Sequence, residues 1–324
     1  MYKIGIDLGG TKIYGIISDI NGKIINRVKV KTAVKDGYQT ILNQIQELAV
    51  ELTDKAKLSF TEIDSIGVAA PSAIDTNQGV LLHAPNLNWH LLPMRDDLSR
   101  LMKKPVWLDN DVNMGLYGEY HIASNKNWNQ IYGIFVGTGV GGAYISQGEL
   151  VRGHNFTAGE IGHITLKIDG PLCNCGQKGC LEAIAGKIGI IRYIAKKIDK
   201  SHQSTLLDEI SPTWRQGVGS GALKKAWLAN DSLTVKAMTR AAKALGIAAA
   251  SVINLIGVDA IIFGGGVMEE MGDLLIPTIR AYMDRHAMAN GSQNVDLHLA
   301  QLGDDSIALG AALYSSHFSD LISK

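Results

Sequence analysis

Apolar and polar positions alternate over residues 3–31, with interruptions at Gly9-Gly10 and at Asn21-Gly22. A period of two predicts strands with one buried face, and Asn-Gly between two such runs is typical of a tight hairpin turn. Residues 38–57 instead carry apolar side chains at helical spacing, namely Ile41, Ile45, Leu48 and Leu52. The pattern predicts a three-stranded meander, an amphipathic helix that returns over it, and a buried strand at residues 65–69.

The same pattern recurs over residues 131–151, IYGIFVGTGVGGAYISQGELV, which again runs strand, glycine turn, strand, turn, strand. Gly133 then corresponds to Gly5, and Gly137 corresponds to Gly9. Two halves that each open with a meander around a glycine turn favour two similar domains. Because hairpins are common, coincidence between two unrelated hairpins is the alternative.

The second half of the chain adds long helical patterns. Asp231 or Ser232 is in position to cap an alanine-rich helix that ends near Ile256, and a strand at residues 259–263 follows it. The polar stretch 200–225 is irregular and receives no assignment. Strands alternating with helices in this way predict the α/β class.

The length of 324 residues is sufficient for two domains of ordinary size. We expect an N-terminal α/β domain over residues 1–116, completed by an apolar C-terminal helix at 305–324. A C-terminal α/β domain would then span residues 117–304. The last helix, which begins with an Asp-Ser cap, is expected to pack back across the domain junction.

Composition excludes several classes of protein. The 31 basic residues balance 31 acidic residues, so a nucleic-acid partner is not expected. The sequence shows no apolar run of membrane-spanning length and no secretory leader at its start, which predicts a cytoplasmic protein without a membrane partner. All three cysteines fall within residues 173–180, CNCGQKGC. An odd number spaced this tightly favours thiolates around a metal over a disulfide framework.

The two glycine turns are candidate phosphate sites, because backbone N–H groups there can approach phosphate oxygens without a Cβ in the way. Gly137, Gly139 and Gly142 formally match a dinucleotide fingerprint, but a strand follows where that fold requires a helix. An Asp beside the first turn could hold Mg²⁺ through water, which assigns Asp7 to the metal and Thr11 and Lys12 to the phosphates. An ordinary hairpin is the alternative for Gly9-Gly10.

Several motifs in this order resemble the ROK family of sugar kinases and related repressors: DLGGTK, Asn110-Asp111, VGTGVGG, Glu160-Ile-Gly-His163, CNCGQKGCLE and FGGGV. The resemblance covers nearly the whole chain. It implies the actin-like ATPase fold of hexokinase and the heat-shock ATPases, in which two α/β domains close over ATP and sugar. It also implies a homodimer.

The cysteines and His163 make a set of three sulfur ligands and one nitrogen ligand, which matches tetrahedral structural zinc. The spacing is not the common finger pattern, and buried cysteines with a core histidine are the alternative. The resemblance implies that His163, Cys173, Cys175 and Cys180 bind Zn²⁺. It further implies that His163 contacts a sugar hydroxyl, and that Glu160 and Glu182 accept hydrogen bonds from sugar hydroxyls.

Polar residues follow the apolar strand at 105–108, where α/β enzymes place their chemistry. By resemblance, Asp111 is the general base that accepts the proton of the attacking hydroxyl, and Asn110 orients the sugar. Asp109 is the rival base, and a helix N-cap is the structural alternative for Asp111. Asn86, in the retained stretch GVLLHAPNLNW, is assigned to the sugar as well.

The resemblance places the remaining nucleotide contacts at Thr138 and Gly139 of the second turn and at Gly265 and Gly266, where a structural turn is the alternative. Ser72 stands where the family usually has Gly, so it could add a sugar contact or narrow the pocket.

The expected activity is an ATP-dependent hexose kinase acting on the 6-hydroxyl of glucose, with Mg²⁺. An N-acetylmannosamine or N-acetylglucosamine kinase shares these residues and is the close alternative. A non-catalytic sugar-sensing regulator of the same family is the alternative from another class. It is disfavoured because Asp111 is present and because no DNA-reading segment is expected before the strand at Lys3.

Overall fold

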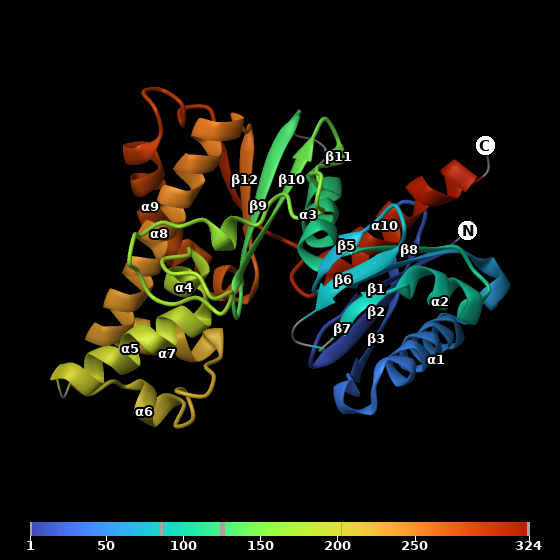
Figure 1. Cartoon of the computed structure of the whole chain (residues 1–324), viewed down its shortest axis with the longest axis horizontal. Helices are drawn as coiled ribbons and strands as arrows, with labels where there is room; N and C mark the ends of the chain where they lie inside the picture. The colour runs from blue at the N-terminus through green and yellow to red at the C-terminus, as the bar shows by residue number, and fades with distance from the viewer. Residues whose placement is uncertain (1, 85–86, 88, 124–126, 202, 323–324) are drawn as a thin grey trace. The chain divides into compact units, whose positions relative to one another are not determined.

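The computed structural model describes residues 2–322 except 85–86, 88, 124–126 and 202, and these residues form two units (Figure 1). Unit 1 comprises residues 1–127, 150–158 and 304–324, and unit 2 comprises residues 128–149 and 159–303. Each unit has its own hydrophobic core around one five-stranded sheet.

The sheet of unit 1 has the strand order β3-β2-β1-β4-β8. Its strands are β1 (Tyr2–Leu8), β2 (Lys12–Asp19), β3 (Ile24–Lys31), β4 (Ile63–Ala70) and β8 (Val106–Asn110). β1, β2 and β3 are antiparallel neighbours, whereas β1, β4 and β8 run parallel. The meander, the helix α1 (Tyr38–Ala56) and the buried strand predicted from the sequence are therefore confirmed.

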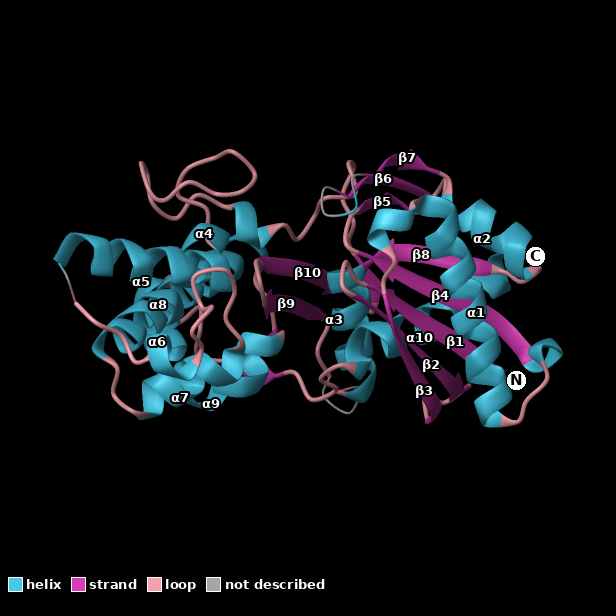
Figure 2. Cartoon of the chain, turned by 90° about the horizontal axis from the view of Figure 1, so that it is seen from below, coloured by secondary structure: helices cyan, strands magenta, loops and turns pink. Residues whose placement is uncertain are grey.

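Helices cover the sheet of unit 1. α1 packs its apolar face on the sheet through buried leucines and isoleucines (Figure 2), and α2 (Met94–Met102) contacts β8. The helices α3 (Asp111–Ile122) and α10 (Asp305–Ile322) pack together, and α10 lies on β1 and β4. A small sheet of β5 (Ala73–Asp75), β6 (Val80–Ala84) and β7 (Trp89–Leu92) completes the unit.

Close approach of α10 explains two of the glycines in this sheet. A Cβ at Gly5 would come within 1.8 Å of the Ala308 carbonyl oxygen, and one at Gly67 within 1.9 Å of the Ala311 carbonyl oxygen. Gly5 and Gly67 are register partners on β1 and β4. The C-terminal helix can therefore lie against the sheet only because neither strand carries a side chain at this position.

Unit 2 repeats the topology of unit 1, with the order β11-β10-β9-β12-β13. Its strands are β9 (Gln130–Val136), β10 (Val140–Ser146), β11 (Glu149–Leu150), β12 (Ala260–Gly264) and β13 (Asp296–Leu299). β9 and β10 are antiparallel, and β12 lies parallel to β9 and β13. The predicted duplication is confirmed, because Gly133 holds the fourth position of β9 as Gly5 holds the fourth position of β1.

The described residues of unit 2 form six α-helices, of which α4 contacts β10 and α9 contacts β9, β12 and β13. The six are α4 (Glu182–Ala185), α5 (Lys187–Ser201), α6 (Leu207–Ile210), α7 (Ser220–Leu228), α8 (Ser232–Ile256) and α9 (Gly266–His286). The cap of α8 is Asp231, whose carboxylate accepts the Thr234 N–H at 2.7 Å. Within the described residues, α8 alone has the length and composition to cross a membrane, and 56% of its most apolar window is buried in the unit.

The structure differs from the sequence analysis in the unit boundaries and in the stretch 200–225. A boundary at residue 116 would divide α3, which stays whole because it packs along α10. Residues 150–158 return to unit 1, although the sequence around them belongs to unit 2. The stretch 200–225 is only partly irregular, since α6 and most of α7 lie within it, whereas residues 211–219 form no helix or strand.

Candidate functional site

Three carboxylates gather at one edge of the first sheet. Asp7 is the penultimate residue of β1 and Asp109 is the penultimate residue of β8, and both are level with Ala69 of the intervening strand β4. Asp111 follows directly as the first residue of α3. The carboxyl ends of these parallel strands meet at the same edge of the sheet. Asp7 and the candidate base Asp111 therefore lie at the same edge, although they belong to different elements.

The pKa of Asp7 is raised from 3.8 to about 7. The main cause is that the carboxyl has lost much of its water, and the negative charge of Asp111 adds to the effect, while the Lys12 ammonium opposes it. A carboxylate pair held at this cost is suited to a divalent cation, which would offset both negative charges.

We expect the stability of the metal-free protein to fall as pH rises through 7. The folded-state pKa of Asp7 exceeds its unfolded value, so its contribution is complete below pH 4 and is lost as Asp7 ionises. The loss is about 4 kcal/mol at most, from about three pKa units. Asp7→Asn should therefore raise the melting temperature in EDTA at pH 8 but not at pH 4.

Melting curves of wild type, Asp7→Asn and the exposed control Asp54→Asn across this pH range provide the test. Added Mg²⁺ should recover the stability of wild type at pH 8 and leave Asp7→Asn unchanged. Parallel pH profiles for wild type and Asp7→Asn would contradict the assignment.

Asp109 is fully committed to structure. Its side chain is 1% exposed, and one oxygen accepts Arg152 Nε at 2.9 Å and Arg152 Nη2 at 2.5 Å. The other oxygen accepts Asn113 Nδ2 at 3.0 Å and the Asn110 N–H at 2.8 Å. The Arg152 guanidinium lies over the rings of Trp107 and Tyr314. This network holds the end of β8, directly before Asp111, in place. It also leaves Asp109 unsuited to proton transfer.

Removing Arg152 should destabilise unit 1. Arg152→Met leaves the buried Asp109 carboxylate without its cation, and breaking such a pair typically costs about 3–5 kcal/mol. The double variant Asp109→Asn/Arg152→Met removes the orphaned charge and should recover at least half of the loss. Denaturant unfolding of both single variants and the double variant gives the coupling energy. Strictly additive effects would show that the two side chains do not act as a pair.

Asn110, rather than Asp111, is the N-cap of α3. Its Oδ1 accepts the N–H groups of Val112 at 2.8 Å and Asn113 at 3.1 Å, and its Nδ2 donates to the Ser72 carbonyl at 3.1 Å. No other described residue accepts a hydrogen bond from this amide, so its second hydrogen is available to a ligand. The Asp111 carboxylate accepts its neighbour's N–H, from Val112, at 2.9 Å.

The Ser72 hydroxyl faces the protein rather than an open pocket. It donates to the His83 carbonyl at 2.6 Å and accepts the His83 N–H at 3.2 Å, which ties the loop to β6. A direct sugar contact from this hydroxyl is therefore not what the geometry favours. Asn86, the other residue predicted near the sugar, lies outside the described residues.

The first glycine turn is closed by a hydrogen bond from the Gly9 N–H to the Lys12 carbonyl, at 2.9 Å. A Cβ at Gly10 would meet no atom within 4 Å, so this side of the turn is open. Thr11 is exposed beside it. The Lys12 ammonium forms an ion pair with Asp304 at 2.9 Å, so a phosphate there would compete with Asp304 for this cation.

The second glycine turn is fastened to α4 and α5. The carbonyls of Gly137 and Thr138 accept the N–H groups of Lys187 and Ile188. Glu182 Oε2 accepts the Val140 N–H at 3.2 Å, and a Cβ at Gly139 would come within 2.1 Å of the same carboxylate. A side chain at position 139 would therefore force the Glu182 carboxylate to move.

Gly265 and Gly266 lie at the end of β12. Gly265 has φ +81°, and a Cβ there would come within 2.7 Å of the Val136 carbonyl oxygen, so both conformation and contact demand glycine. Gly266 begins the 21-residue helix α9. A structural turn, the alternative considered in the sequence analysis, therefore explains why residue 265 is glycine. The N–H groups at the start of α9 lie next to this turn and could bind a phosphate.

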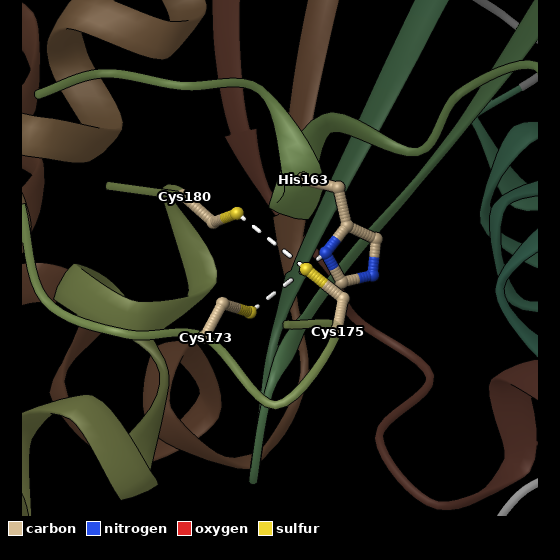
Figure 3. A group of neighbouring side chains, drawn as sticks. All are labelled: His163, Cys173, Cys175 and Cys180. Carbon is tan, nitrogen blue, oxygen red and sulfur yellow. Dashed lines mark hydrogen bonds between the residues drawn. The ribbon is translucent and has the colours of Figure 1, made fainter. Parts of the chain in front are cut away.

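The three cysteines and His163 converge at one point in unit 2 (Figure 3). Their ligand atoms all lie within 4.8 Å of one another, with 3.7 Å between the sulfurs of Cys175 and Cys180 and 3.9 Å between Cys173 Sγ and His163 Nδ1. Two sulfurs on a tetrahedral zinc ion are separated by about 3.8 Å, given a Zn–S distance of about 2.3 Å. The four side chains thus fit a zinc ion.

The environment of the cluster supports the same fit. Without a metal, burial raises the pKa of Cys173 to about 12 and raises the pKa of Cys180 above its usual range. Both thiols therefore remain protonated, and a cation would supply the charge that favours the thiolates. His163 turns Nδ1 toward the sulfurs and Nε2 away from them (Figure 3).

Two carboxylates flank the cluster. Glu182 Oε1 accepts a hydrogen bond from Cys173 Sγ at 3.3 Å, so Glu182 bridges the cluster and the second glycine turn. Glu160 precedes the short helical turn η4 (Ile161–His163). The pKa of Glu160 is raised by loss of water and by the charge of Glu182, against the opposing effect of His163.

Two sheets of equal strand order, each with a glycine turn between its first two strands, form an α/β fold consistent with the actin-like ATPases. Comparison with known proteins identifies the family. The chain belongs to the ROK family, whose model matches residues 3–317.

The relatives include enzymes and repressors. The glucokinase of Halalkalibacterium halodurans is 31% identical over 309 residues, which cover 95% of this chain and 92% of that protein. The xylose repressor of Bacillus subtilis is 26% identical and covers 99% of this chain and 79% of the repressor. A ROK family glucokinase from Streptomyces griseus in complex with glucose and AMPPNP superposes with a TM-score of 0.83 at 28% identity, covering 98% of this chain and 100% of that one.

Arg152 is the residue that the sequence analysis missed. It is a single arginine in a polar loop, 43 residues from its partner Asp109, and no spacing rule connects the two. The only sequence signal was that Asp109 follows a buried strand and would need a partner if buried.

Proposed function

We propose that the protein transfers the γ-phosphoryl group of ATP to the 6-hydroxyl of glucose, with Asp111 as the general base. The observation that carries the proposal is the division of roles between neighbouring carboxylates. Asp109 is neutralised by Arg152, and Asp7 has a raised pKa and is suited to binding a cation. Asp111, at the start of α3, is the carboxylate that we assign to proton transfer. The glucokinase relatives support a sugar kinase.

In this mechanism Asp111 accepts the proton of the 6-hydroxyl as its oxygen attacks the phosphorus. Asn110 offers its remaining amide hydrogen to the sugar and fixes the start of α3 through its cap. In unit 2, we assign Glu160, His163 Nε2 and Glu182 to sugar hydroxyls. An epimer whose hydroxyl points elsewhere would leave one of these buried groups without its hydrogen bond, so it would bind less tightly.

The nucleotide is assigned to both glycine turns and to the start of α9. Gly9, Gly10 and Thr11 would offer N–H groups to the phosphates, and Lys12 would leave Asp304 for them. Thr138, Gly139, Gly265 and Gly266 are assigned to the rest of the nucleotide. Mg²⁺ bound with the phosphates supplies charge neutralisation, with Asp7 as its protein partner. Zn²⁺ bound by His163, Cys173, Cys175 and Cys180 would hold the cysteine loop in place and fix the orientation of the His163 ring.

The test is a coupled ADP-release assay with Mg-ATP and six sugars: glucose, mannose, fructose, allose, N-acetylglucosamine and N-acetylmannosamine. Turnover fastest on glucose and lost in Asp111→Asn supports the proposal. Preference for an N-acetyl sugar would keep the mechanism and reject glucose as the substrate.

A sugar-sensing regulator is the second candidate, because xylose repressors match nearly the whole chain. The same assay separates the two. Sugar binding in calorimetry without turnover of any of the six sugars favours the regulator.

A further inference from the structure

Two cavities on unit 2 share lining residues, and the proposed function uses neither of them. The cavities have volumes of about 360 Å³ and about 510 Å³, and both are lined by Lys167, Tyr193 and Arg240. The two cavities are lined by residues of α5 and α8, and these helices contact each other. We refer to the two cavities together as the basic groove, because of the residues described next.

One wall of the basic groove is a row of cations on α5. Arg192, Lys196 and Lys200 recur every four residues, so they share a helix face at intervals of about 6 Å. Like charges at this spacing destabilise a helix. No acidic side chain in the described part of the chain forms an ion pair with any of the three.

The opposite wall is formed by α8, where Lys236, Arg240 and Lys243 line the second cavity. The Arg240 guanidinium lies 5.0 Å from the ring centre of Tyr193, which links the two rows across the floor. Among the lining residues described, Asp169 is the one acid. Because the whole chain carries equal numbers of acidic and basic residues, this positive charge is a local concentration.

We propose that the basic groove binds an elongated anion with several phosphate groups. A single phosphate would engage two or three cations, whereas the α5 row alone extends over about 12 Å of helix. Lysine ammonium groups suit phosphates because they are compact, rotatable charges, and Arg240 over Tyr193 adds a planar donor on an aromatic ring. The phosphates belong either to free inorganic polyphosphate or to a nucleoside triphosphate.

The groove also contacts the cysteine loop. Arg192 Nη2 donates to Asn174 Oδ1 at 3.0 Å, and Arg192 Nη1 donates to the Leu172 carbonyl at 3.4 Å. Ala183 lines the groove and packs against Cys173 and Cys180. An anion held by Arg192 therefore acts on residues 171–180 as well.

The test is calorimetric titration of the whole protein with sodium tripolyphosphate at low salt, and it does not depend on catalytic activity. The variant Lys196→Gln/Lys200→Gln removes two charges from the exposed α5 face, and Lys224→Gln/Lys225→Gln on α7 is the matched control. We expect about tenfold weaker binding in the α5 variant, from two screened contacts, and no change in the control. Amide exchange should slow in α5, α8 and residues 171–180.

The alternatives give different results. Equal affinity for ATP and tripolyphosphate identifies free phosphate chains as sufficient, and tighter binding of ATP with protection at Tyr193 identifies a nucleotide. Absence of binding, equal weakening in both variants, or protection confined to residues 7–12 and 137–142 would overturn the proposal. A polyglutamate peptide that binds the groove more tightly than tripolyphosphate would replace it with an acidic protein partner.

Discussion

Asp111→Asn is expected to lower kcat for sugar phosphorylation by about three orders of magnitude, within the range that general base catalysis provides. The substitution keeps the shape of the side chain and its acceptor for the Val112 N–H, so the start of α3 should persist. Only the capacity to take a proton is lost. Glucose affinity, measured by calorimetry without nucleotide, should change by less than about threefold, because Asn can still accept or donate a hydrogen bond.

The control for this experiment is a measurement of protein stability, which is made alongside the measurement of kcat. The melting temperature of Asp111→Asn in EDTA at pH 8 should be equal to or above that of wild type, because removing the charge of Asp111 relieves its effect on Asp7. Asp109→Asn should behave in the opposite way, with lower stability from the weakened Arg152 pair. If Asp111→Asn retains kcat within tenfold of wild type, Asp111 is not the base.

The architecture could be predicted from the sequence because its signals are local. Alternation over β1 to β3 and over β9 to β11, with glycine or Asn-Gly turns between them, specifies both meanders before any long-range contact is known. The cysteine cluster could be predicted for the same reason, since its thiols lie within eight residues and His163 is ten residues upstream of Cys173.

The roles of individual polar side chains depended on distant partners and could not be predicted. Asp109 and Asp111 are alike in sequence, and Asp109 is structural because of its contacts with Arg152 and Asn113. Ser72 was predicted either to add a sugar contact or to narrow the pocket, and its hydroxyl is hydrogen-bonded to the backbone of His83 on β6. A helix cap was the structural alternative for Asp111, yet Asn110 fills that position, because its backbone is extended and its side chain accepts the N–H groups of Val112 and Asn113.

Loss of zinc is expected to have the largest effect on the structure of unit 2. Cys175→Ser is the variant of choice, because Cys175 is exposed whereas Cys173 and Cys180 are buried against Ala183 and their replacement would also disturb packing. We expect one zinc ion per chain in wild type by elemental analysis and almost none in Cys175→Ser. Lys178→Ser in the same loop, which removes no ligand, is the control and should keep its zinc.

The consequence for activity follows from the contacts of the loop. Zinc sites of this kind contribute about 10 kcal/mol or more to local folding, so residues 171–180 should exchange their amides freely once the metal is lost. His163 would lose its fixed orientation, and Glu182 would lose the Cys173 end of its bridge to the second glycine turn. Sugar affinity should therefore fall at least tenfold. Metal loss to a chelator should accelerate as pH falls, because protons compete for the thiolates. A zinc-free protein with unchanged sugar affinity would show that the cluster does not organise the site.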